Sequence, residues 1–245
     1  QATFERDGFV TVPLYGALEL EALSRLYAEL HRDPQQEFFP STFSLDPEYR
    51  RLVDREIRAV TTSVVGGLLR DVTLRYASFI AKSPGPRGTV NVHQDMTLVD
   101  ESEFSGLNIW CPLEPTTPEN GALHVLPGSH RWVPTYRGST IPGLYDRERE
   151  ALRLAMTPLY LRAGEAVIFD QSVIHYSPPN GTARTRVVTN VFFTRAEARF
   201  RTAWFDPTSH RGVVEIFEQD PDFVSRFDQF GHDIHARPRI GRSLG

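Results

Sequence analysis

The chain has 245 residues, of which 40% are hydrophobic and 11% aromatic, enough to bury one sizeable core. Its formal net charge of -4 argues against a nucleic-acid partner, and no apolar run approaches the roughly 20 residues that span a bilayer. Cys111 is the only cysteine, so the fold does not depend on an oxidising compartment. We therefore expect a single domain over residues 1–245, either monomeric or homodimeric, in the cytoplasm.

The amino-terminal third is predicted to be mostly helical. After a short strand-like run at 9–12, leucines recur at helical spacing from Leu18 to Leu30, and a second apolar face of the same period extends from Tyr49 to Leu69. Both segments are interpreted as packing helices that carry no chemistry.

The residues from about 72 to 195 are predicted to form a β-rich core. Short runs of strand-forming residues are separated here by Gly and Pro turns, at 74–80, 107–111, 122–126, 158–161, 166–169 and 187–193. Many short strands without intervening helices favour an antiparallel sandwich or barrel. The loop from Arg131 to Arg153 is long enough to form a lid, and the last 45 residues are expected to be irregular.

A histidine–carboxylate pair, His93-Gln94-Asp95, is followed 80 residues after Asp95 by His175. In a strand, residues i and i+2 point to the same face, so His93 and Asp95 are expected side by side. Two imidazoles and one carboxylate on one face of a ferrous ion leave three coordination positions open. A His-x-Asp step alone is common by chance, and the prediction of a metal site depends on its combination with His175 in a β-rich chain.

A cationic fork follows the second histidine, because Arg186 lies eleven residues after His175. A guanidinium matches a carboxylate in shape and charge, so this residue is predicted to bind a dicarboxylate cosubstrate. Arg184 is an alternative, since strand alternation would place both arginines on one face. Ser177 shares strand parity with His175 and could reach the same carboxylate. Lys82 is the only lysine in the chain, so no other position can supply a functional lysine.

The remaining histidines are given structural interpretations. His124 falls in an expected strand and His130 in a turn, where core or turn roles are favoured over metal binding. The others are dispersed in polar segments and are interpreted as surface residues: His31, His210, His232 and His235.

The chain resembles the phytanoyl-CoA dioxygenase family of Fe(II)/2-oxoglutarate oxygenases over essentially its whole length. The resemblance rests on 4–9 (FERDGF), His93-Gln94-Asp95, Trp110, 120–130 (NGALHVLPGSH), and His175-Tyr176-Ser177 through Arg186. It implies a mainly β fold with flanking helices, a double-stranded β-helix of the jelly-roll, cupin-like type. It also implies that His93, Asp95 and His175 hold Fe(II), that Arg186 binds 2-oxoglutarate, and that O2 is the oxidant. Gln94, Trp110 and Ser177 stand where the family places further residues around cosubstrate and metal.

The same resemblance implies hydroxylation of an unactivated C–H bond in a small molecule, with release of succinate and CO2. Related halogenases lack the carboxylate that Asp95 supplies here; desaturation, epimerisation and cyclisation use the same triad and stay open. The arginine-rich composition favours a biosynthetic role in secondary metabolism. Two further alternatives are a cupin-like isomerase that does not use 2-oxoglutarate and a catalytically silent module.

The substrate is the least determined part of the prediction. Candidate pocket residues come from the segment after the iron pair, the lid and the tail: Met96, Thr97, Trp132, Tyr136, Arg137, Tyr145, Arg201, Trp204 and Phe205. This mixture of aromatic side chains and arginine suits a medium-sized, partly apolar molecule that carries an anionic group.

Overall fold

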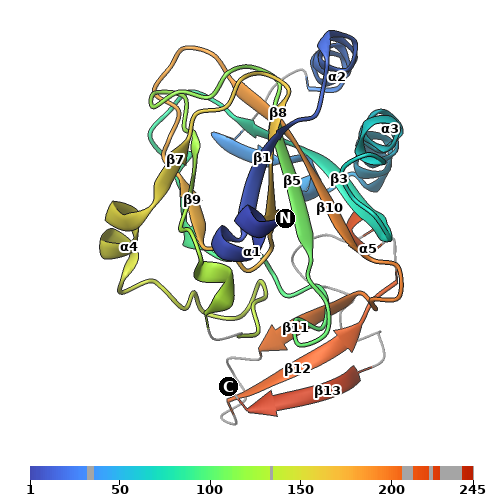
Figure 1. The fold of residues 1–245 in the computed structure, drawn as a ribbon, viewed down its shortest axis with the longest axis vertical. Coiled ribbons are helices and arrows are strands. Elements are labelled where there is room, and N and C mark those ends of the chain that lie inside the picture. The colour runs from blue at the N-terminus through green and yellow to red at the C-terminus, as the bar shows by residue number, and fades with distance from the viewer. Residues whose placement is uncertain (32–35, 133–134, 206–211, 221–222, 227–238, 245) are drawn as a thin grey trace.

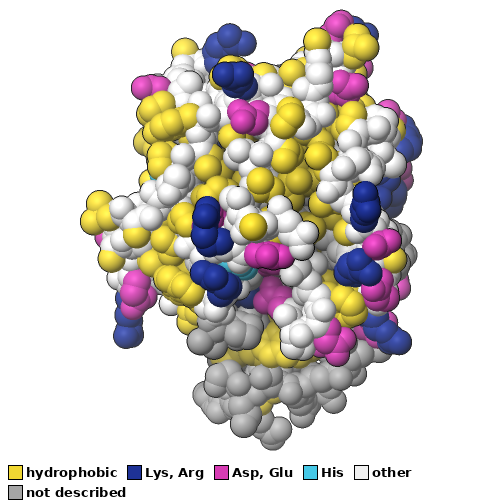
Figure 2. Space-filling model, viewed as in Figure 1, with side chains coloured by type: hydrophobic (Ala, Val, Ile, Leu, Met, Phe, Trp, Pro, Cys, Tyr) yellow, Lys and Arg dark blue, Asp and Glu magenta, His cyan; other side chains and the backbone are white. Residues whose placement is uncertain are grey.

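The computed structural model describes residues 1–31, 36–132, 135–205, 212–220, 223–226 and 239–244. Its centre consists of two facing antiparallel sheets, as expected for a jelly roll (Figure 1). None of the helices in these ranges is long and apolar enough to cross a membrane. On the face shown in Figure 2, acidic and basic side chains are intermixed and form no continuous basic patch.

The larger sheet has six strands. In spatial order they are β1 (Phe9–Pro13), β8 (Glu165–Asp170), β5 (Leu107–Pro112), β10 (Arg186–Arg195), β3 (Val72–Lys82) and β2 (Phe38–Pro40). The central strand β10 pairs with β3 on one side and β5 on the other. Because side chains alternate along a strand, these strands present one row to the helices and another to the facing sheet.

The smaller sheet has four strands and carries the two histidines of the predicted triad. Its order is β4 (Val90–His93), β9 (His175–Ser177), β6 (Leu123–Val125) and β7 (Thr157–Leu159). His93 and His175 are direct partners across the β4–β9 pair. The pairing explains how two residues distant in sequence reach one site.

Two helices cover the outer face of the larger sheet (Figure 1). α2 (Ala17–Leu30) and α3 (Pro47–Val65) confirm the two predicted helices. α3 begins where the side chain of Asp46 accepts a hydrogen bond from the Glu48 N–H (2.9 Å), and it buries Val53 and Ile57 at i, i+4 spacing. Shorter helices are α1 (Ala2–Asp7), η1 (Ser41–Phe43), η2 (Ser129–Arg131) and α4 (Arg149–Ala155).

The carboxyl-terminal segment is more regular than the sequence predicted. Its three strands, β11 (Arg201–Phe205), β12 (Val213–Glu218) and β13 (Arg239–Leu244), form a separate antiparallel sheet, with a short helix α5 (Phe223–Arg226) between the last two. Phe200 and Phe223 pack against Phe192 of β10 in one buried cluster. The expectation of an irregular tail was therefore wrong: these strands are stabilised by contacts with the core that a local pattern does not reveal.

The interpretation of His31 as a surface residue was also wrong. Its imidazole stacks on Tyr27 with ring centroids 4.4 Å apart, and its ring nitrogens lie within hydrogen-bond distance of the Tyr49 hydroxyl. Burial lowers the pKa of His31 to about 4, so the ring is neutral at physiological pH. His210, His232 and His235 lie outside the described residues.

Candidate metal and cosubstrate site

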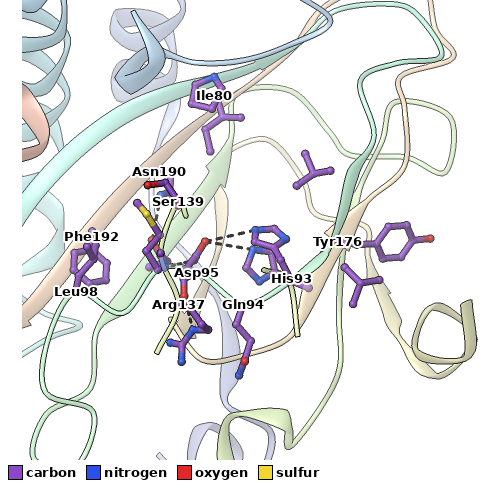
Figure 3. A pocket seen from close by; sticks show the side chains of 18 of the residues that line it. Ile80, His93, Gln94, Asp95, Leu98, Arg137, Ser139, Tyr176, Asn190 and Phe192 are labelled. Atoms are coloured by element: carbon purple, nitrogen blue, oxygen red, sulfur yellow. Dashed lines mark hydrogen bonds and ion pairs between the residues drawn. The ribbon is translucent and has the colours of Figure 1, made fainter. Parts of the chain in front are cut away.

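Asp95 faces the two neighbouring histidines of the smaller sheet from one side, and Figure 3 shows its carboxylate beside His93. Its Oδ1 atom is 3.7 Å from Nε2 of His93 and 3.7 Å from Nε2 of His175. Nitrogen and oxygen atoms from the three side chains all lie within 4.8 Å of one another. The arrangement brings together the predicted triad as one compact set of two nitrogen donors and one oxygen donor.

The physical reason given for the His93–Asp95 pair was incomplete. β4 ends at His93, so Asp95 lies in the following loop and not on the same strand face. The loop is instead tied to the connection between β8 and β9: the Asp95 N–H donates to the Gln171 carbonyl (3.1 Å), and Gln94 Nε2 donates to the Ser172 carbonyl (2.5 Å). These tertiary hydrogen bonds bring the carboxylate back towards His175.

Each histidine is oriented by a backbone carbonyl two residues earlier. Nδ1 of His93 is 2.8 Å from the Asn91 carbonyl, and Nδ1 of His175 is 2.9 Å from the Val173 carbonyl. Because a carbonyl only accepts, the proton is assigned to Nδ1, which leaves the Nε2 lone pairs directed towards Asp95 Oδ1. Burial lowers the pKa of His175 to about 4, which keeps this ring neutral. Against the effect of burial, Asp95 raises the pKa of His93, so a metal ion bound here would displace any proton from its Nε2. Two imidazole nitrogens and a carboxylate oxygen fit the facial ligand set of a ferrous ion.

The second oxygen of the aspartate is held by an amide. Asn108 of β5 donates from Nδ2 to Asp95 Oδ2 (2.7 Å), and Asn190 of β10 donates to Asn108 Oδ1 (3.1 Å). Neither asparagine was predicted from the sequence. Their positions could have indicated them, because Asn108 is two residues from Trp110 and Asn190 is four from Arg186, so each asparagine shares a strand face with a predicted site residue.

Two cationic side chains face each other at one end of the larger sheet. Arg186 of β10 and Lys82 of β3 are direct cross-strand partners, and their exposed fractions are 1% and 0%. Burial, followed by the charge of Arg186, lowers the pKa of Lys82 to about 6, and burial lowers that of Arg186 to about 10. Like charges directly opposite in a sheet are destabilising, and the lowered pKa of Lys82 favours its neutral form when no anion is bound beside Arg186. A bound anion would favour the protonated form of Lys82.

The protein itself supplies neutral acceptors but no carboxylate ion-paired with either cation among its described residues. Lys82 Nζ donates to the Ser177 hydroxyl and to the Pro178 carbonyl (2.6 Å). Arg186 donates to the Gly121 carbonyl, lies over the Trp110 ring at 5.2 Å, and keeps a buried Nε without a hydrogen-bond partner. A guanidinium with an unused donor beside a second cation is suited to a carboxylate ligand.

The Asn-Gly motif has a structural role at this cationic end. Gly121 adopts φ +76°, and a Cβ atom there would approach the Pro178 carbonyl oxygen to 2.6 Å and Lys82 Cδ to 2.8 Å. Glycine therefore permits the backbone to approach both cations and to present its carbonyl to Arg186. Arg184, the alternative considered from sequence, is exposed and precedes the first residue of β10.

One cavity of about 820 Å³ contains the triad and extends along the larger sheet. Eight of the residues predicted for the cosubstrate or substrate are among those that line it: Gln94, Met96, Trp110, Tyr136, Arg137, Tyr145, Ser177 and Arg186. The predicted residues that are not in this lining are Thr97, Trp132, Arg201, Trp204 and Phe205. Thr97 is buried, and its hydroxyl accepts from the Arg137 N–H (3.0 Å). Trp132 is 46% exposed beside Tyr145.

Arg137 connects the lid to the metal-binding loop. Its Nε donates to the Asp95 carbonyl (2.6 Å), and its two terminal nitrogens pair with the Glu101 carboxylate. Glu101 also accepts from Gln171 Nε2 (2.7 Å). The guanidinium is thus engaged by the protein, with 10% of the side chain exposed.

The family of the chain is shown by comparison with known proteins. The model of the phytanoyl-CoA dioxygenase (PhyH) family matches residues 4–188. The phytanoyl-CoA dioxygenase domain-containing protein 1 homolog of Dictyostelium discoideum is 29% identical over 127 residues, which cover 49% of this chain and 45% of that protein. The Danio rerio protein of the same description is 30% identical over 145 residues, which cover 56% and 48%. The chain therefore spans about half the length of these curated relatives.

Solved structures with less than 25% sequence identity show the same fold. EvdO2 from Micromonospora carbonacea var. aurantiaca, complexed with 2-oxoglutarate, aligns with a TM-score of 0.57 and 23% identity over 80% of this chain and 89% of that one. The epimerase SnoN, in complex with Fe3+, alpha ketoglutarate and nogalamycin RO, gives 0.58 and 21% over 81% and 83%. EctD from S. alaskensis, with 2-oxoglutarate and 5-hydroxyectoine, gives 0.56 and 22% over 81% and 76%. These neighbours confirm the predicted double-stranded β-helix.

The family match covers the cationic pair and all three ligands of the triad. Residues of the family motifs contact one another in the site. Arg186 donates a hydrogen bond to the Gly121 carbonyl, and His93 and His175 are cross-strand partners. A triad that could hold a metal ion lies within the matched residues, and the chain belongs to the phytanoyl-CoA dioxygenase family.

Proposed function

We propose that this protein is an Fe(II)/2-oxoglutarate-dependent dioxygenase that hydroxylates an unactivated C–H bond of a small molecule. The observation that carries the proposal is that one cavity contains both the His–Asp–His donor set and the Arg186 guanidinium, which Lys82 faces from the neighbouring strand. His93, Asp95 and His175 would hold the iron. With 2-oxoglutarate and O2, the bound metal supplies the oxidising power for C–H cleavage, and succinate and CO2 are the coproducts.

The cationic end is proposed to bind the distal carboxylate of 2-oxoglutarate. Arg186 has a buried, unused Nε donor, and Lys82 faces it from the neighbouring strand. The Ser177 hydroxyl lies within hydrogen-bond distance of Lys82 Nζ, on the same strand as His175. Trp110, stacked against the guanidinium, would exclude water from the bound carboxylate. Lys82 therefore joins the residues predicted from sequence for this role.

Gln94 has a different proposed role from the other cosubstrate residues. Its amide nitrogen donates to the Ser172 carbonyl, and its amide oxygen accepts from the Tyr145 hydroxyl (3.3 Å). Both ends of the side chain are engaged, so Gln94 positions the loop between His93 and Asp95 and the lid residue Tyr145. It would influence cosubstrate binding through the metal ligands.

A role in natural-product metabolism is part of the same proposal. SnoN, an epimerase, and SnoK, a carbocyclase, are described as proteins of nogalamycin biosynthesis, and both share the fold. They also represent the alternative outcomes of epimerisation and ring formation. Asp95 supports oxygen chemistry over halogenation because it fills the carboxylate position of the ligand set. Product analysis by mass separates hydroxylation, which adds 16 mass units, from desaturation, which removes two, and from epimerisation, which changes none.

The two other functional classes are less well supported. A cupin-like isomerase has no need for a buried arginine in the cavity lining with a lysine opposite it, and a silent module has no need for an intact triad. Both features are present here. Strict dependence of turnover on 2-oxoglutarate would exclude the isomerase, and any coupled turnover would exclude the silent module.

The first test is an anaerobic titration of metal-free protein with Fe(II) and then 2-oxoglutarate. We expect a visible metal-to-ligand charge-transfer band that is lost in His175→Ala and in Asp95→Ala. Circular dichroism of both variants controls for folding. Failure of the band to form in folded, iron-loaded wild-type protein would contradict the proposed function.

A further inference from the structure

Four rungs of paired side chains extend along β3 and β10 on the inner face of the larger sheet. The pairs are Lys82 with Arg186, Ile80 with Val188, Ser78 with Asn190, and Tyr76 with Phe192. Their chemistry changes in order from cationic through aliphatic and polar to aromatic. Six residues of strand separate the first rung from the last, which corresponds to roughly 20 Å.

The aromatic rung closes the end of the cavity opposite the cations. Tyr76 and Phe192 stack with centroids 5.3 Å apart and an interplanar angle of 24°. Leu98 packs against the same cluster, and Figure 3 shows Leu98 and Phe192 together on the side of Asp95 away from Tyr176. Tyr76, Leu98 and Phe192 all line the cavity, and because Leu98 and Phe192 are only 3% and 1% exposed, the partly exposed Tyr76 offers most of the surface that a ring could contact.

The triad lies close to this aromatic end. Asn108 is the cross-strand partner of Phe192, and its amide holds the Asp95 carboxylate. A five-carbon diacid held at the cationic rung and reaching the metal position would leave the last rungs free for substrate. Those rungs, with the lid residues above them, form the part of the cavity available to substrate.

Each His, Asp and Arg side chain in the described lining of the cavity already has a proposed role or a partner within the protein. Among the described residues that line it, the His, Asp and Arg side chains are His93, Asp95, Arg137, His175 and Arg186. Three form the triad, and Arg186 belongs to the cationic rung. Arg137 is paired with Glu101 and with the Asp95 carbonyl. The expectation of an anionic substrate depended on Arg137 of the lid and Arg201 of the tail. Arg137 is engaged, and Arg201 lies outside this lining and is paired with Asp100 (2.6 Å).

Two polar groups remain available near the aromatic rung. Asn190 uses its Nδ2 to donate to Asn108, and among the described residues no donor is bonded to its Oδ1. Ser139, an exposed lid residue, lines the same cavity as Asn190 and Asp95. A neutral amide and a hydroxyl can recognise an alcohol or carbonyl group, whereas neither compensates a full charge.

We propose that the substrate is an uncharged molecule that lays a ring against Tyr76 and Phe192 and presents a hydroxyl or carbonyl group to Asn190 and Ser139. This proposal rests on the function proposed above and specifies its substrate class. It places the ring within the aromatic part of the cavity, next to Asp95.

The test uses three probes of one ring system that differ in charge: 1-naphthalenemethanol, 1-naphthoate and 1-naphthylmethylammonium. Binding to metal-free protein is measured by calorimetry with saturating 2-oxoglutarate present, which prevents 1-naphthoate from occupying the cationic rung. We expect 1-naphthalenemethanol to bind at least tenfold more tightly than either ion. Equal or tighter binding of an ion would overturn the proposal, as would no binding of the neutral probe.

A gain of charge provides the second arm of the test. Ser139→Lys places a free cation at the cavity from an exposed lid position and should strengthen 1-naphthoate binding at least tenfold. Ser63→Lys, on the exposed face of α3, adds the same charge away from the cavity and should change nothing. Equal effects of the two variants on 1-naphthoate binding would contradict the proposed placement of the substrate next to Ser139. The charge-transfer titration is independent of these probes, so failure of the substrate class is distinguishable from failure of the oxygenase function.

Discussion

Asn108 Nδ2 donates to Asp95 Oδ2 at 2.7 Å, while Asp95 Oδ1 faces both histidine Nε2 atoms at 3.7 Å. The amide thus fixes which carboxylate oxygen is presented to the metal position. It also fixes the plane of the carboxylate, because Asn190 in turn holds Asn108. Outer residues of this kind commonly change metal affinity by about 10- to 100-fold.

Asn108→Leu should therefore weaken metal binding at least tenfold, since Asp95 loses the donor that orients it. An anaerobic titration with Co(II) measures the affinity directly, without turnover. Asn108→Ser, which can donate through water, should recover part of the loss. Unchanged affinity in the folded Leu variant would show that Asp95 needs no such support.

Arg186→Ala should weaken 2-oxoglutarate binding by two orders of magnitude or more and leave iron binding intact. The reason is that one bidentate donor is lost from a buried site where water cannot replace it fully. Arg184→Ala is the matched control, because this neighbouring arginine is exposed. The measurement is a 2-oxoglutarate titration of the charge-transfer band. An equal loss in both variants would point to net charge rather than to a specific contact.

Lys82 should take up a proton when 2-oxoglutarate binds. Burial holds its pKa at about 6, so Lys82 is neutral at pH 8, and a bound carboxylate raises the pKa towards its ordinary value. Calorimetry at pH 8 in buffers of different ionisation enthalpy should show an uptake approaching one proton per cosubstrate, absent in Lys82→Met. Equal proton uptake by the two proteins would contradict this coupling.

The same lowered pKa predicts how stability without cosubstrate depends on pH. Between pH 6 and 10.5 the unfolded chain binds a proton at Lys82 that the folded protein lacks. Stability therefore rises with pH across this window, and the contribution of Lys82 is constant below it. Thermal unfolding of Lys82→Met should show a smaller rise from pH 6.5 to pH 9 than the wild type. Parallel curves would show that Lys82 is charged in the folded protein.

Glu101→Gln should destabilise the lid by leaving the Arg137 guanidinium without its carboxylate. Removing one partner of a largely buried pair costs about 3 kcal/mol, and Gln171 also loses a charged acceptor. Chemical denaturation measures the change in the free energy of unfolding. Asp146→Asn breaks the more exposed pair with Arg149 and should cost less than about 1 kcal/mol. Equal costs would indicate that the lid is not held by the Arg137–Glu101 pair.

Both main helices and the β-rich core were predictable because their signals are local. Hydrophobic residues recur every three or four positions in α2 and α3, and short strand-forming runs end at Gly and Pro turns. β2 and the carboxyl-terminal strands were missed because three to six residues carry little pattern of their own. Their pairing partners are set by contacts far away in the chain, such as Phe38 with Lys82.

By itself, the sequence determined the candidate metal ligands and the candidate cosubstrate arginine, because residue type and family-specific spacing are encoded locally. The tertiary structure decided their geometry. Asp95 reaches His175 through hydrogen bonds to the β8–β9 connection, and Lys82 joins the proposed cosubstrate site only because β3 pairs with β10 in a register that opposes it to Arg186. It also decided that Arg137 is engaged, since Glu101 approaches it only in the folded chain. Long-range pairing, burial and charge compensation are properties of neighbours in space, which a linear pattern does not specify.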